Sequence, residues 1–181
     1  MKPHSYSSLG IILARRNFGE ADRILSIYTK DHGRISLIAK GIRKPKSKKR
    51  GHLEVFSFVK FQALSGRGLD MMTEAELIDD FSDIRKSLNK VSLAYYFAEV
   101  IGRITHEGEP SIGLFNLILN NFQKLKKTKG LKTLRINFLN NLLIEMGYWP
   151  ENKKNENPDY VLEEVIERKI SSVRVGKIIS S

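Results

Sequence analysis

The sequence predicts an α+β protein, with an N-terminal antiparallel β-barrel followed by an all-helical C-terminal region. Two observations support this class. Apolar and polar residues alternate up to about residue 80, and the apolar residues then recur with a helical period. The 181 residues are enough to bury a real core. We expect a barrel domain at 1–80, a helical domain at 81–150 and a polar linker with short terminal elements at 151–181.

Five short strands are expected before residue 80. In the third strand, Ile35, Leu37 and Ala39 share one face. Glycine-containing turns separate the second strand from the third ("DHG") and the fourth from the fifth ("SGRG"). Such strands with mostly tight connections are typical of a small barrel. The expected strands are residues 9–15, 23–30, 34–40, 52–64 and 69–78.

Helices are expected from residue 87 onward. Ser87 is a suitable N-cap for the first helix, whose middle is apolar on nearly all sides. The third helix should end at Gly147, a residue favoured just after a helix. The expected helices are residues 87–105, 111–127, 131–147 and 159–170, and residues 171–181 form a strand or a frayed end.

Basic residues are concentrated in one loop. The net charge is +11, and residues 40–51 contain seven Lys or Arg and no acid. Such a local excess indicates a surface for a polyanion, because cations on a loop displace the counterions of phosphates. A solvated loop without a partner is the alternative. The predicted binding residues are Lys40, Arg43, Lys44, Lys46, Lys48, Lys49 and Arg50, together with Arg34 and Arg67.

Two weaker signals remain open. In "VFSFVKF", Phe56 and Phe58 share one face and Phe61 the other, so an exposed set can stack on bases, or both sets can be core. A second basic cluster at 124–132 either contacts an acidic partner or is a solvated helix end, where lysines favour the helix dipole.

No catalytic signature is present. The chain has no cysteine, and its four histidines match no metal-ligand spacing. Glu20 and Asp22 are expected to cap a turn and pair with Arg23. No apolar stretch reaches membrane-spanning length. We therefore expect a protein that is not an enzyme, has no cofactor or metal, and resides in the cytoplasm.

Taken together, several segments resemble the RecO family of bacterial recombination mediators. They include "NFGEADRILSIYTKDHGRISLIAKGIRKPKSK", "LEVFSFVKFQALSGRGLDMMTEAEL" and "MGYWPE", and cover about residues 6–151. The resemblance implies an oligonucleotide-binding (OB) barrel that binds single- and double-stranded DNA. It also implies annealing of complementary strands and help in replacing single-strand-binding protein with RecA. The implied partners are RecR and the acidic tail of single-strand-binding protein, in a cytoplasmic, nucleoid-associated setting.

The sequence departs from the family pattern after Pro150. Many relatives carry a four-cysteine zinc module there, which this cysteine-free chain lacks. An acidic, apolar-ended peptide fits the second basic cluster, where an arginine would clamp a carboxylate better than a lysine. The residues considered for this contact are Arg103, Lys124, Lys126, Lys127, Lys132 and Arg135.

Charge alone leaves other functions open. An OB-fold RNA-binding or ribosome-associated protein shares the phosphate-binding requirement, and only contacts to the 2′-hydroxyl separate it from a DNA binder. An adaptor whose basic loop meets an acidic protein is a further alternative. A nuclease is the least supported, because no carboxylate cluster stands out.

Overall fold

A computed structural model of the chain describes residues 4–45, 47, 53–153 and 155–166. These residues form two compact units. The first comprises the described residues up to Asp80 together with Thr105–Ser111, and the second comprises the remainder. The sequence prediction placed residues 105–111 in the helical region, whereas the structure packs them with the barrel.

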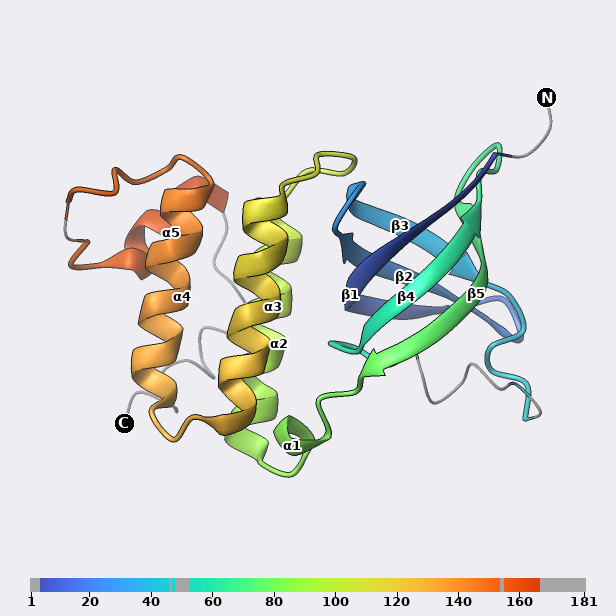
Figure 1. Ribbon diagram of the computed structural model, residues 1–181, viewed down its shortest axis with the longest axis horizontal. Coiled ribbons are helices and arrows are strands. Elements are labelled where there is room, and N and C mark those ends of the chain that lie inside the picture. Colours follow the sequence, from blue (N-terminus) through green and yellow to red (C-terminus); the bar gives the residue numbers. More distant parts are fainter. Residues whose placement is uncertain (1–3, 46, 48–52, 154, 167–181) are drawn as a thin grey trace. The chain divides into compact units, whose positions relative to one another are not determined.

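Five strands close into a barrel in the order β1-β2-β3-β5-β4, with β4 pairing back to β1 (Figure 1). All pairs are antiparallel except β3 and β5, which are parallel over a short stretch. This arrangement confirms the predicted OB-type barrel. The strands are β1 (Ser5–Phe18), β2 (Asp22–Thr29), β3 (Gly33–Ala39), β4 (Phe58–Leu64) and β5 (Asp70–Asp79).

The barrel core follows the alternation of the strands. Leu37 and Ala39 are buried in it and Ile35 packs against it, so the face predicted for the third strand is confirmed. In β1 the pairing with β2 shifts register between Ile12 and Ala14. Such an irregularity bends the strand. Beyond it, β1 pairs only with β2 and its residues are exposed.

The fourth strand is shorter than predicted. It begins at Phe58, because Phe56 adopts a left-handed backbone conformation (φ 58°) that interrupts the extended chain. The Phe56 amide donates instead to the Ile12 carbonyl oxygen at 2.6 Å. Phe56, Phe58 and Phe61 are all buried. The alternative in which an exposed set of these rings stacks on bases is therefore wrong, and both sets are core.

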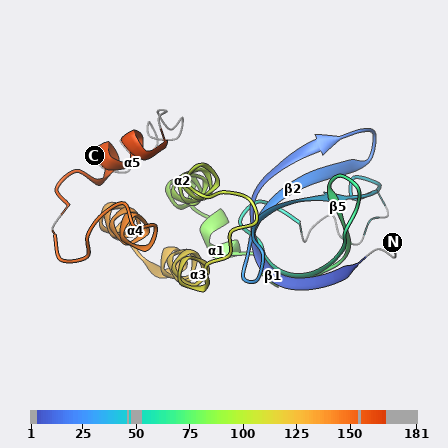
Figure 2. The ribbon, with the colours of Figure 1, turned by 90° about the horizontal axis from the view of Figure 1, so that it is seen from above.

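The second unit is helical. Figures 1 and 2 show α2, α3 and α4 side by side, with successive helices running in opposite directions. No described helix is long and apolar enough to cross a membrane. The helices are α1 (Ser82–Arg85), α2 (Leu88–Ile104), α3 (Ile112–Lys127), α4 (Leu131–Glu145) and α5 (Pro158–Ile166).

Aromatic side chains join the three long helices. Phe97 of α2 is fully buried, and its ring centroid lies 4.1 Å from that of Phe138 and 6.1 Å from that of Phe122. The predicted stop after α4 is confirmed at Gly147, whose φ of 76° suits glycine. The predicted last helix is confirmed as far as Ile166. Its expected continuation and residues 171–181 lie outside the described residues.

Candidate nucleic-acid interface

A shallow groove lies on the outer face of β1, β2 and β3. We call it the β1–β3 groove; it encloses about 180 Å³. The strand register places Arg16 opposite Ile24 and Ala14 opposite Ser26, and Ser26 in turn lies opposite Ser36. The residues that line the groove are Ala14, Arg15, Arg16, Ile24, Ser26, Ser36 and Leu69.

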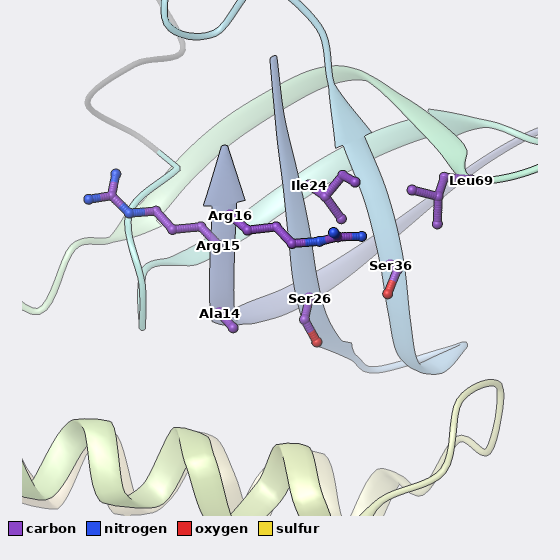
Figure 3. A pocket seen from close by; sticks show the side chains of 7 residues that line it. All are labelled: Ala14, Arg15, Arg16, Ile24, Ser26, Ser36 and Leu69. Atoms are coloured by element: carbon purple, nitrogen blue, oxygen red, sulfur yellow. The ribbon is translucent and has the colours of Figure 1, made fainter. Parts of the chain in front are cut away.

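The groove combines apolar, hydroxyl and cationic groups. Figure 3 shows the two arginine side chains leaving β1 in opposite directions, one of them across β2 towards β3. Arg16 is exposed, and its side chain forms no hydrogen bond or ion pair with any other described residue. Leu69 is also exposed, and it lies on the β4–β5 turn. A guanidinium beside an apolar surface suits a phosphate and its neighbouring base.

The basic loop begins next to this face. The Arg43 amide donates to the Ala21 carbonyl oxygen at 2.9 Å, and the Gly41 amide donates to the Asp22 carboxylate at 2.7 Å. Lys40 and Lys44 are exposed. These contacts fix the first part of the loop beside the β1–β2 turn. The predicted residues Lys46, Lys48, Lys49 and Arg50 lie outside the described residues.

One carboxylate, that of Glu54, forms ion pairs with two arginines of this face. The Glu54 carboxylate accepts from Arg15 Nη1 at 2.6 Å and from Arg23 Nη1 at 3.5 Å. It therefore neutralises part of the charge that a phosphate would meet. The prediction that Glu20 and Asp22 pair with Arg23 has no counterpart among the ion pairs of the described residues, where Glu54 takes that place.

Replacing Glu54 with glutamine should therefore strengthen binding to single-stranded DNA. If the released Arg15 gains one phosphate contact, the log–log dependence of the binding constant on salt should steepen by about 0.7. Fluorescence anisotropy across a salt series measures this slope. Glu74 is exposed on β5, so Glu74→Gln makes the same change of charge at another place and should leave the slope unchanged. Equal effects of the two substitutions would show that only net charge matters.

Arg34 and Arg67 occupy different settings. Arg67 is exposed on the β4–β5 turn, two residues before Leu69 of the groove. Arg34 is held within the first unit: its Nε and Nη2 donate to the Thr105 carbonyl oxygen at 3.2 and 3.0 Å, and its Nη1 lies 3.4 Å from Glu107 Oε1. These contacts conflict with the predicted DNA contact of Arg34, which we leave out of the interface.

The residues considered for the acidic-peptide contact differ in their surroundings: some are exposed and others contact their own chain. Lys124, Lys127 and Lys132 are exposed at the α3–α4 connection. Lys126 instead places its Nζ 5.5 Å from the centre of the Phe81 ring. Arg103 pairs with Glu99 on its own helix at 2.9 Å. A peptide contact of the three exposed lysines stays a prediction.

Arg135 is not available to a partner peptide in this structure. Only 6% of the residue is exposed, and its guanidinium lies 4.9 Å from the centre of the Tyr96 ring. Its Nη2 donates to the Asp159 carboxylate of α5. In this structure the carboxylate that Arg135 pairs with belongs to its own chain, so a peptide contact of Arg135 stays a prediction that this setting does not favour.

No arrangement for metal catalysis appears in the part of the chain that the structure describes. None of its His, Asp and Glu side chains form a group of three that could hold a metal ion. The arrangement of the β1–β3 groove suits binding through charge and surface contact.

Comparisons with known proteins show similarity to one family over most of the chain. The family model "Recombination protein O N terminal" matches residues 1–81, and "Recombination protein O C terminal" matches residues 85–155. A DNA repair protein RecO of Dehalococcoides mccartyi is 35% identical over 156 residues. Those of Rubrobacter xylanophilus and Pelotomaculum thermopropionicum are each 40% identical, over 146 and 115 residues.

The chain spans only part of these relatives. The matches cover 86%, 80% and 64% of this chain, but 62%, 58% and 45% of the Dehalococcoides, Rubrobacter and Pelotomaculum proteins. The first family model ends at residue 81 and the second begins at residue 85, close to the border between the barrel and helical units.

Proposed function

Because the chain belongs to the RecO family of DNA repair proteins, we propose that it acts in recombinational DNA repair as a DNA-binding mediator. It anneals complementary strands and helps to load RecA onto DNA coated by single-strand-binding protein, with RecR as a further partner. This role places it at the nucleoid in the bacterial cytoplasm. The observation that carries the proposal is the basic face of the barrel, which joins Arg16, Lys40, Arg43 and Lys44 to a groove with apolar surface.

The mechanism follows from electrostatics. Two complementary strands repel each other through their phosphates, and base pairing supplies the free energy of annealing. A protein that neutralises phosphates on both strands lowers the repulsion without reading sequence. The loop cations act on the backbone, while the β1–β3 groove holds a strand against the barrel. No bond is made or broken, so this function requires no catalytic group.

The test compares the intact protein with a variant in which Lys44, Lys46, Lys48, Lys49 and Arg50 are serine. If the loop makes four or five phosphate contacts, the salt slope for single-stranded DNA should be about −3 in the parent. It should fall towards zero in the variant, except for the contacts that the retained Arg16, Lys40 and Arg43 still make. Annealing of two labelled complementary strands should be lost alongside. Fluorescence anisotropy and a strand-annealing assay measure the two quantities.

A control variant removes three cations outside the barrel. Lys124, Lys127 and Lys132 changed together to serine reduce net charge on the helical unit and should leave the slope close to that of the parent. Equal annealing by the five-residue variant and the parent would contradict the proposal. Tighter binding to RNA than to DNA of the same sequence would favour an RNA-binding function instead.

A further inference from the structure

A second, separate cavity lies on the barrel unit. It is open, encloses about 400 Å³ and shares no lining residue with the β1–β3 groove. Five parts of the barrel unit contribute to it: the start of β1, the β2–β3 turn, the start of β3, the β4–β5 turn with the start of β5, and the segment 105–111. We call it the Tyr6 cavity, and the residues used below are Tyr6, Asp31, His32, Ile35, Asp70 and Pro110.

Two carboxylates in this cavity are held by neutral donors. Ser8 Oγ donates to Asp31 Oδ2 at 2.6 Å, and the Tyr6 hydroxyl donates to Asp70 Oδ2 at 2.7 Å. Burial, and then the hydrogen bond to Asp70, raises the pKa of Tyr6, so the hydroxyl stays a donor at neutral pH. Within the described ranges, neither carboxylate forms an ion pair with a lysine or arginine. Two oriented and uncompensated acids are notable in a chain of net charge +11.

The rest of the lining is aromatic and apolar. The Tyr6 and His32 rings meet edge to face, with centroids 4.6 Å apart, and Ile35 and Pro110 add aliphatic surface. A long basic side chain matches these walls, because its methylene stem packs on apolar surface while its charged end seeks carboxylates and aromatic faces. A DNA phosphate does not match them, since both carboxylates would repel it.

We propose that the Tyr6 cavity binds a basic side chain presented by a protein partner. An arginine fits best, because its planar guanidinium matches the geometry of a carboxylate and can stack on aromatic faces. The cavity is distinct from the DNA-binding face, so the barrel can hold a strand and a protein partner on different surfaces. This inference stands whether or not the chain anneals DNA.

The test uses the isotope-labelled full chain and N-acetyl-arginine amide as the probe. Amide and side-chain NMR shifts should change saturably at Tyr6, His32 and Gly108, with a dissociation constant in the millimolar range that suits so small a ligand. N-acetyl-citrulline amide has nearly the same shape without the charge, and it should produce no saturable shifts at these residues. Equal shifts from both probes, or no saturable shift from the arginine probe, would overturn the proposal.

Variants locate the site. Asp70→Asn keeps an acceptor for the Tyr6 hydroxyl but removes the charge, and it should weaken binding of the arginine probe about tenfold, because a charge-assisted hydrogen bond becomes a neutral one. Glu74→Gln makes the same charge change on β5 outside the cavity and should have no effect. An equal loss in both variants would show that the probe responds to overall charge, which would also overturn the proposal. The dispersion of the NMR spectrum reports whether each variant is folded.

Discussion

Replacing Asp159 with alanine is expected to lower the free energy of unfolding of the helical unit by about 2–4 kcal/mol. The substitution leaves the guanidinium of Arg135 buried without its carboxylate, and a lone buried charge is strongly unfavourable. The Asp159 side chain is 34% exposed, so we set the expected loss somewhat below the range for fully buried pairs, because water compensates part of it. Urea denaturation followed by circular dichroism at the helical signal measures the change.

A double substitution separates the ion pair from ordinary packing. Arg135→Met with Asp159→Leu removes both charges together and should unfold within about 1 kcal/mol of the parent, because apolar residues of similar size can replace a buried pair. Arg103→Ala, which breaks a more exposed pair with Glu99, should cost less than about 1 kcal/mol. If Asp159→Ala costs no more than Arg103→Ala, the buried pair does not hold α5 in place.

Much of the fold could be predicted because its signals are local. The alternation of Ile35, Leu37 and Ala39 reports a strand face directly, and the helical period between residues 87 and 147 reports three helices. Features that depend on distant contacts were missed. The left-handed Phe56 is stabilised by its bond to Ile12, and no neighbouring residue in the sequence indicates that partner.

The candidate site could likewise be predicted only where its features are local in the sequence. The density of charge in residues 40–51 marks a basic loop without any knowledge of the fold. Whether a given cation can contact a phosphate depends on which residues the fold places next to it. Arg34 and Arg135 lie next to acids that are far away in the sequence, Glu107 and Asp159, and a count of basic residues does not indicate these ion pairs.

Arg16 is the opposite case: the sequence prediction did not include it, and the structure places it at the β1–β3 groove. Arg16 lies on the exposed part of β1 that extends beyond the pairing with β4. In the sequence it follows the apolar run from Leu9 to Ala14, which gives no indication of where the exposed part begins. An arginine just after an apolar run can be read as a strand end or as part of a binding face. The register with β2 places Arg16 on the outer face opposite Ile24, a position that the sequence alone does not give.

Gly33→Ala is the second substitution with a large expected effect, and it should lower the free energy of unfolding of the barrel unit by at least about 2 kcal/mol. Gly33 has a φ of 65°, a conformation that costs an L-residue about 1–2 kcal/mol. A Cβ atom there would also lie 2.3 Å from the backbone carbonyl oxygen of Glu109, which cannot move as a flexible side chain can. Urea denaturation followed by a signal from the barrel unit measures the change.

The same substitution tests how the segment 105–111 is held. The Gly108 amide donates to the Arg34 carbonyl oxygen at 3.0 Å, so displacement of Glu109 should speed hydrogen exchange at Gly108. Gly68→Ala is the matched control, because no atom lies within 4 Å of its added Cβ and its backbone is not left-handed. Unchanged exchange at Gly108 in Gly33→Ala would mean that the segment is held by other contacts.

In Gly33→Ala the free energy of unfolding should therefore fall, whereas the affinity for single-stranded DNA should not. Glu107 accepts from Ser36 Oγ at 2.9 Å and pairs with Arg34, and Ser36 also lines the β1–β3 groove. A loosened segment 105–111 releases one guanidinium and one hydroxyl on the outer face of β3, both of which can contact a phosphate. Below its unfolding transition, Gly33→Ala should therefore bind single-stranded DNA at least as tightly as the parent. Weaker binding by the folded variant would show that segment 105–111 itself belongs to the DNA-binding face.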